Sequence, residues 1–162
     1  MPQLALAPGP IERIRADVAV VPLFAGERPL RAAAGRVDWR LCGRLSRLVK
    51  SNRATAEAGE TLLFPPGRRL PFSRILWFGL GDARGYSDDR FRRDLARIVA
   101  VVTAAGAADW ALQAPGRASG LIGARRAIEL LLEEPRFADQ PLTLLEDPAG
   151  QKDIAELLRA QR

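Results

Sequence analysis

The chain has 162 residues, of which 48% are hydrophobic and 27% are charged, a composition typical of one globular domain rather than of a disordered chain. It contains no histidine and one cysteine, which excludes histidine-dependent catalytic relays, imidazole or thiolate zinc sites and an internal disulfide. The net charge is +6, and all of the 25 cations except Lys50 and Lys152 are arginine, which favours weak binding of polyanions.

The N-terminal residues MPQLALAPGP have neither the positive region nor the long apolar run of a signal peptide. No apolar run approaches the ~20 residues that a membrane-spanning helix needs. We therefore expect a cytoplasmic, soluble protein without a membrane partner. Cys42 is expected to fill the core, because free cysteine is among the most buried residue types.

The first half of the chain predicts four strands and one helix. Residues 3–7 and 17–24 are apolar runs suited to strands, with the breaker PGP after the first. Residues 60–64 and 75–78 predict two more strands, and the loop between them suits a hairpin. Residues 36–50 predict a single helix, because apolar side chains recur at helical spacing at Val37, Leu41, Leu45 and Leu48.

A long helix is predicted after the fourth strand. Ser87 can cap it, and the acids Asp88 and Asp89 in its first turn suit the positive end of the helix dipole. Gly106 marks its end, and residues 109–114 predict the next strand.

The last part of the chain predicts two helices and a strand. Ser119 can cap a helix that Pro135 ends, with Leu121 among the side chains that face inward. Residues 142–145 predict the final strand, and the apolar positions between Ile154 and Leu158 predict a closing helix.

These elements predict one α/β domain over residues 1–162. Strands that alternate with helices, with little polar alternation inside the strands, indicate a mixed, mostly parallel sheet covered by helices on both faces. The expected architecture is a three-layer α/β/α sandwich.

The stretch RILWFGLGDARG, residues 74–85, ends a buried strand in a glycine turn. Gly79, Gly81 and Gly85 have the spacing G-x-G-x-x-x-G, one residue longer than the dinucleotide fingerprint, and no acidic ribose ligand follows at the required distance. The favoured interpretation is a bend that needs glycine for positive φ or close packing. A second interpretation is a phosphate-binding site beyond the carboxyl ends of the strands. Its candidate ligand-binding residues are Gly79, Gly81, Gly116 and Gly120.

An arginine row lies along the predicted helix 36–50. Arg36, Arg40, Arg44 and Arg47 are candidate nucleic-acid contacts, although a solvated helix face is the commoner outcome for such a row. No aromatic residue is expected beside the row to stack bases, because Trp39, Trp77 and Trp110 are predicted to pack in the core or between helix and sheet. Sequence-adjacent acidic pairs diverge on a helix, so no metal site and no cofactor are predicted.

Three segments together resemble a known family. AEAGETLLFPPG (56–67), RILWFGLGD (74–82) and SGLIGARRAIELLLEEPRF (119–137) are similar, in order and spacing, to the N-terminal domain of leucyl aminopeptidases. The resemblance implies that family's macro-domain-like fold. The chain departs from the family pattern at Ser119, which stands for the usual acid, and at Arg126, which stands for the usual tyrosine.

The resemblance also bears on function. The family's catalytic domain binds two divalent metals and carries an N-T-D-A-E-G-R signature, which residues 52–60 (NRATAEAGE) echo without its metal-binding Asp or its Arg. We therefore expect a non-catalytic relative that acts in oligomerisation or in regulating a partner, for example a separate aminopeptidase catalytic chain. The alternatives are a nucleotide or ADP-ribose binding module, as in macro domains proper, and a weak DNA-binding protein.

Overall fold

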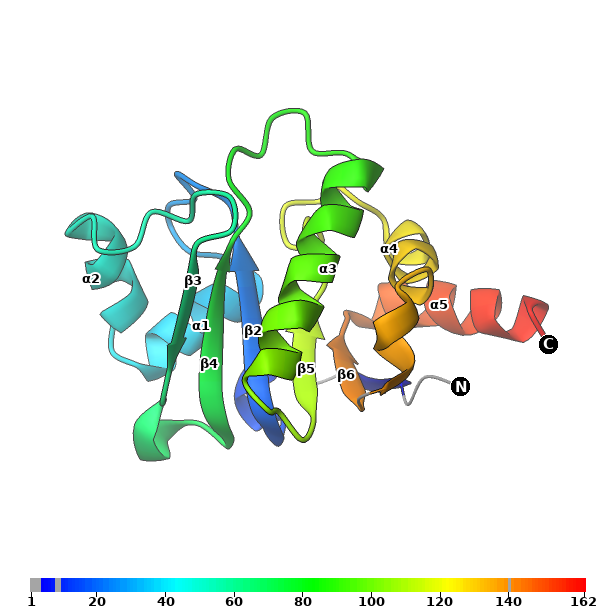
Figure 1. Cartoon of the computed structure of the whole chain (residues 1–162), viewed down its shortest axis with the longest axis horizontal. Coiled ribbons are helices and arrows are strands. Elements are labelled where there is room, and N and C mark those ends of the chain that lie inside the picture. The colour runs from blue at the N-terminus through cyan, green and yellow to red at the C-terminus, as the bar shows by residue number, and fades with distance from the viewer. Residues whose placement is uncertain (1–3, 8–9, 140) are drawn as a thin grey trace.

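The computed structural model describes residues 4–7, 10–139 and 141–162, and its centre is a six-stranded sheet (Figure 1). The strand order is β1-β6-β5-β2-β4-β3, and only β3 runs antiparallel to its neighbour. The strands are β1 (Leu4–Ala7), β2 (Ala16–Leu23), β3 (Thr61–Phe64), β4 (Phe72–Gly79), β5 (Trp110–Gln113) and β6 (Leu142–Leu145). The mixed, mostly parallel sheet predicted from the sequence is confirmed.

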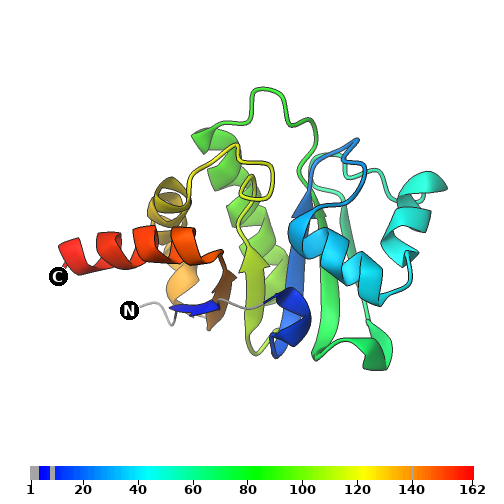
Figure 2. The same ribbon diagram turned by 180° about the vertical axis from the view of Figure 1, so that it is seen from behind.

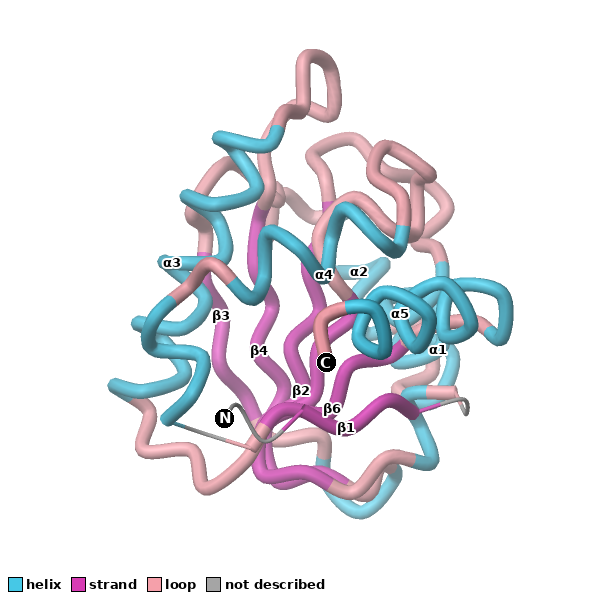
Figure 3. The backbone as a smooth tube through the Cα atoms, turned by 90° about the vertical axis from the view of Figure 1, so that its right-hand side faces the viewer, coloured by secondary structure: helices cyan, strands magenta, loops and turns pink. Residues whose placement is uncertain are grey.

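Helices cover both faces of this sheet, which makes three layers (Figures 2 and 3). One face carries α1 and α2, and the other carries α3 and α4, with α5 packed beside α4. The helices are α1 (Ala32–Arg40), α2 (Arg44–Lys50), α3 (Asp88–Ala104), α4 (Ala124–Leu132) and α5 (Pro148–Ala160), with short 3₁₀ turns η1 (Ile11–Arg13), η2 (Gly67–Arg69) and η3 (Pro135–Asp139).

The central strands bury both of their faces. In β2, Val18 and Val20 pack into the core under α3 and α4, whereas Ala19 and Val21 pack into the core under α1 and α2. Successive side chains of a strand point to opposite faces, so a strand covered on both sides must be apolar throughout. This arrangement explains the unbroken apolar runs in the sequence.

Two local predictions are confirmed in detail. Residues 60–64 and 75–78 form the expected antiparallel pair, with Thr61 opposite Phe78 and Phe64 opposite Ile75. The hydroxyl of Ser87 accepts a hydrogen bond from the backbone N–H of Arg90 at 3.3 Å, so Ser87 caps α3 as predicted.

The predicted helix 36–50 is wrong in one respect, because the chain forms two helices there. Cys42 and Gly43 have φ values of 53° and 79°, which an α-helix does not allow. Val37 of α1 and Leu45 of α2 are nevertheless both buried, so the apolar spacing continues across the break. Cys42 lies in the turn and is exposed, which corrects the prediction that it fills the core.

Three further predictions about side chains are corrected. Ser119 does not cap α4, which begins after Gly123; instead its hydroxyl donates to the carbonyl of Gly116 at 3.3 Å. Leu121 therefore lies in a loop and is 47% exposed. Trp39, in the last turn of α1, is 83% exposed, whereas Trp77 and Trp110 are buried as predicted. Within the described part of the chain, no helix combines the length and the apolar character needed to cross a membrane.

Candidate functional site

The neighbouring parallel strands β5, β2 and β4 have their carboxyl ends on the same side of the sheet. Open α/β sheets bind their ligands beyond these strand ends. At the end of β4, a Cβ on Gly79 would fall on the carbonyl oxygen of Glu57 and 2.7 Å from the carbonyl carbon of Ala56. Gly81 has a φ of 75°, and its N–H donates to the carbonyl of Ala56 at 2.9 Å. Close packing and positive φ thus explain both glycines, as the bend interpretation predicts.

Glu60 organises the loop that packs against this turn. Its carboxylate accepts hydrogen bonds from the N–H groups of Thr55 and Ala56 and from the Thr55 hydroxyl. It also accepts from the indole N–H of the buried Trp77 at 3.0 Å. Burial raises the pKa of the Glu60 carboxyl, but these donors together outweigh burial and hold the pKa below its ordinary value. The acid of the A-G-E-T-L segment is therefore a structural residue.

Arg90 of α3 fixes the loop that follows β4. Its guanidinium donates to the backbone carbonyls of Leu80, Asp82 and Arg84 at 2.9, 2.6 and 3.1 Å. The same guanidinium lies 4.8 Å from the ring centre of Tyr86. The glycine turn and the loop after it are thus held by hydrogen bonds from Arg90.

Tyr86 fills the space between this loop and the sheet. Its ring meets Phe24 edge-on, with 5.0 Å between the ring centres, and its hydroxyl donates to the buried carboxylate of Asp94 at 3.0 Å. Burial, and then the charge of Asp94, raises the pKa of Tyr86 far above its ordinary value, so the phenol is neutral. Burial likewise raises the pKa of Asp94.

The crevice at the carboxyl ends of β2, β4 and β5 is small. A cavity lined by Phe24, Leu80, Gly116 and Ser119, among others, has a volume of about 10 Å³. That is about the room for one water, whereas pockets for small organic ligands occupy about 300–1,000 Å³. Of the four candidate ligand-binding glycines, only Gly116 lines this cavity.

A second loop, residues 115–123, carries the other two candidate glycines. Gly116 has a φ of 79° and packs against Tyr86 and Ile122, and Gly120 has a φ of 71° in open space. Arg117 anchors the loop by donating two hydrogen bonds to the buried carboxylate of Glu146, at 2.8 and 2.6 Å, and one to the carbonyl of Ile122. Hydrogen bonding to Glu146 raises the pKa of the Arg117 guanidinium.

A larger hollow adjoins the ends of β5 and β6. Its volume is about 260 Å³, and its polar lining residues are Arg36, Gln113, Glu146 and Asp147. Arg36 is paired with Glu12 at 2.8 Å, so it is not available as a free cation. No ligand-binding role was assigned to the other three residues from the sequence, because no local motif distinguishes them.

The arginine row is divided by the break between α1 and α2. Arg44 and Arg47 line a surface hollow of about 650 Å³ together with Lys50 and Arg53, which we call the basic hollow. Arg36 and Arg40 belong to α1 and do not line it. The structure thus brings half of the predicted row together with two cations that were not predicted as site residues.

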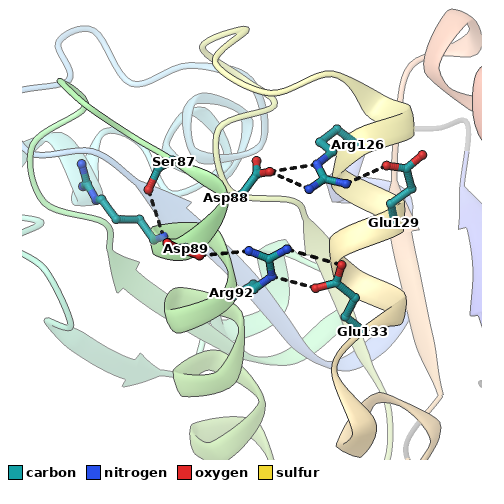
Figure 4. A network of polar contacts seen from close by, with 8 residues as sticks. Ser87, Asp88, Asp89, Arg92, Arg126, Glu129 and Glu133 are labelled. Carbon is teal, nitrogen blue, oxygen red and sulfur yellow. Dashed lines mark hydrogen bonds and ion pairs between the residues drawn. The ribbon is translucent and has the colours of Figure 1, made fainter.

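Arg126, which stands for the family's usual tyrosine, takes part in a network between α3 and α4 (Figure 4). Its guanidinium binds Asp88 at 2.6 Å and Glu129 at 2.9 Å. One turn further along, Arg92 binds Asp89 at 3.0 Å and Glu133 at 2.7 Å. Hydrogen bonding to Arg126 lowers the pKa of Asp88, and hydrogen bonding to Arg92 lowers that of Glu133. This departure from the family pattern is thus accommodated by ion pairs.

No group of three or more acidic, histidine or cysteine side chains suited to a metal ion occurs among residues 4–7, 10–139 and 141–162. The acids Asp88, Asp89, Glu129 and Glu133 each bind a guanidinium rather than one another.

Solved structures place this fold in the macrodomain-like class. The Trypanosoma brucei macrodomain, in a structure with ADP, superposes with a TM-score of 0.73 at 16% identity, covering 96% of this chain and 68% of that one. A tomato leucine aminopeptidase mutant superposes with a TM-score of 0.62 at 14% identity, covering 96% of this chain and 35% of that one. At these identities the likeness shows the fold alone.

The model of the cytosol aminopeptidase family, N-terminal domain, matches residues 20–137. The chain therefore belongs to this family. Probable cytosol aminopeptidases of Alkaliphilus oremlandii and Actinobacillus pleuropneumoniae are 29% identical over 111 residues and 26% identical over 168 residues. These alignments cover 68% and 94% of this chain but only 22% and 33% of the relatives. The matched region is the N-terminal domain, which does not include the family's catalytic domain.

Proposed function

We propose that this chain acts as a non-catalytic assembly or regulatory domain, whose partner is a second copy of itself or an aminopeptidase catalytic chain. The observation that carries the proposal is the match over residues 20–137 to the family's N-terminal domain. The absence of a metal-ligand group among the described residues supports it. Glu60, in the segment that echoes the catalytic signature, binds backbone N–H groups, which also agrees with a structural role.

The edge strand β3 is the surface best suited to assembly. It ends the sheet, and Leu63 at its centre is 43% exposed. The outer edge of a terminal strand offers backbone donors and acceptors that a second chain can pair with. Thr61 faces the same side of the strand, because it lies two residues away.

Activity assays test the catalytic part of this proposal. The purified chain should not hydrolyse leucine amide with added Mn²⁺ or Zn²⁺, because its described residues offer no group of side chains suited to a metal ion. Turnover that a chelator abolishes would contradict the proposal.

Sedimentation velocity over a range of concentrations tests assembly, with the chain alone and mixed with an aminopeptidase catalytic chain. Self-association should weaken about tenfold in Leu63→Ser, because a buried leucine side chain contributes about 1.5 kcal/mol or more. Thr61→Ser should leave association unchanged. A chain that remains monomeric at every concentration and does not bind the catalytic chain would contradict an assembly role.

A second candidate is binding of a nucleotide such as ADP-ribose. The hollow of about 260 Å³ beside β5 and β6 favours it, whereas the filled crevice at Gly116 disfavours it. Binding to the folded state should raise the melting temperature with each tenfold increase in ADP-ribose. An unchanged melting temperature at millimolar ADP-ribose would rule this candidate out.

A further inference from the structure

The net positive charge of the protein comes from one segment. Residues 28–69 contain ten arginine and lysine residues and three acids, a net charge of +7. The remainder contains fifteen cations and sixteen acids, a net charge of −1, so the overall +6 comes from this segment alone. We call residues 28–69 the basic segment. It contains α1, α2, β3 and η2.

The cations of the basic segment are exposed and almost all lack an acidic partner. All ten are exposed, and in the described part of the chain only Arg36 forms an ion pair. Two of the segment's three acids bind other groups: Asp38 accepts from the N–H and hydroxyl of Ser46, and Glu60 accepts from Thr55, Ala56 and Trp77. Like charges gathered with few counter-charges repel one another, so this surface favours an anionic partner.

The basic hollow concentrates these cations. Arg44, Arg47, Lys50 and Arg53 line it, and Leu48 and Ser51 complete its lining. Arg44 lies 5.1 Å from the ring centre of Phe64, which holds its guanidinium in place. Lys50 also lines an adjoining hollow of about 290 Å³, whose apolar lining residues include Pro29, Leu30 and Val49. The surface thus offers a row of cations beside a recess that is partly apolar and also contains Glu27.

Trp39 is an exposed aromatic side chain of the basic segment, and Arg47 of the basic hollow donates to the carbonyl of Cys42, three residues after it, at 2.7 Å. Trp39 lies in the last turn of α1, five residues before Arg44, and is 83% exposed. Burial of its large apolar ring would be favourable, yet the fold leaves it in solvent. Exposed aromatic rings beside a cationic groove are the arrangement by which proteins bind single-stranded nucleic acid, with bases stacked on the rings and phosphates on the cations.

We infer that the α1–α2 surface binds single-stranded nucleic acid, with the strand's phosphates on the basic hollow and a base stacked on Trp39. The base faces of a duplex are covered by their neighbours, so a single strand fits an exposed indole better. The carboxylates of an acidic polypeptide would match the charge, but only a nucleic acid carries a flat ring with every anionic group. The inference is independent of the proposed assembly role.

Tryptophan fluorescence provides a direct readout of binding. Trp77 and Trp110 are buried, so a nucleic acid that binds the surface quenches Trp39 selectively. Titration with oligo-dT should quench this emission at low salt. Contact with four phosphates should give a slope of about −2.8 in the plot of log affinity against log salt concentration.

Two kinds of variant separate phosphate contacts from base stacking. Lys50→Gln/Arg53→Gln removes two cations that make no hydrogen bond or ion pair with described residues, and it should halve the salt slope to about −1.4. The matched control Lys152→Gln/Arg159→Gln removes the same charges from the exposed face of α5 and should leave the slope unchanged. Trp39→Ala, followed by fluorescence anisotropy of a labelled strand, should weaken binding about tenfold.

Three results would overturn the inference. The first is no quenching of Trp39 by oligo-dT at low salt. The second is binding of a duplex or of polyglutamate at the same affinity as oligo-dT, which assigns the surface to charge alone. The third is an unchanged affinity in Trp39→Ala, which removes base stacking from the interaction.

Discussion

The basic segment and residues 88–160, which contain α3, α4 and α5, are both rich in arginine, but their arginines have different partners. In the second region, Arg90 binds three backbone carbonyls, Arg117 binds Glu146, and Arg126 binds Asp88 and Glu129. In the basic segment, Arg36 alone among the described cations has an acidic partner. The same residue type therefore joins structural elements in one region and remains exposed to solvent in the other.

The difference arises from the acids rather than from the number of cations. Asp38 and Glu60 of the basic segment bind backbone N–H groups, whereas Asp88 and Glu133 bind guanidinium groups. A carboxylate whose oxygens already accept from backbone donors has little capacity left for a cation. The cations of the basic segment stay unpaired because three acids are too few for ten cations, and two of the three acids already accept from backbone donors.

The largest predicted effect concerns Arg117, in the region of paired cations. Arg117→Met should lower the free energy of unfolding by about 3–5 kcal/mol, because it leaves the buried carboxylate of Glu146 without its counter-charge. Urea denaturation at neutral pH measures this change.

Arg125 provides the matched control for this prediction. It lies 3.9 Å from Glu156, and both side chains are about half exposed. Arg125→Met should change the stability by no more than about 0.5 kcal/mol. Equal effects of the two substitutions would show that burial does not distinguish these pairs.

The next largest effect concerns Glu60 in the basic segment. Glu60→Gln should lower the free energy of unfolding by about 1–3 kcal/mol at pH 7. An amide oxygen is a weaker acceptor than a carboxylate, and the amide NH₂ would face the N–H groups of Thr55 and Ala56, which are themselves donors. The folded state holds the pKa of Glu60 below its ordinary value. Its stabilising contribution is therefore complete above the unfolded pKa and is lost as the pH falls through the folded pKa.

The difference in stability between the wild type and Glu60→Gln should accordingly shrink as the pH falls below about 4. Thermal unfolding of both proteins from pH 7 to pH 3 measures this difference. A difference that stays constant over this range would show that the carboxylate's charge does not contribute.

The strands and the sandwich could be predicted from the sequence because strands that are buried on both faces form unbroken apolar runs. The runs ILWF and VAVV are apolar throughout, which only a strand covered on two sides requires. The bend at Gly79 and Gly81 could also be predicted, because glycine at the end of a strand implies positive φ or close packing. Whether the four candidate glycines bind a ligand stays a prediction.

The remaining features depend on contacts that a linear pattern does not contain. The break at Cys42 was missed because Val37 and Leu45 keep helical spacing across it. The prediction that Trp39 packs in the core or between helix and sheet is wrong, because the sequence does not determine which way an indole on a helix points. The role of Glu60 was missed because one of its donors, Trp77, lies 17 residues away on another strand.

The smallest predicted effects compare the two regions directly, and they have opposite signs. Arg126→Met removes the cation between Asp88 and Glu129 and should lower the melting temperature by at most about 2 °C at low salt. Lys50→Gln/Arg53→Gln should leave the melting temperature unchanged or raise it slightly, because it reduces repulsion among unpaired cations. Both effects should diminish in 1 M NaCl, where the Debye length is about 3 Å. A fall in melting temperature for both variants would show that the cations of the basic hollow also have acidic partners, and the distinction between the two regions would no longer hold.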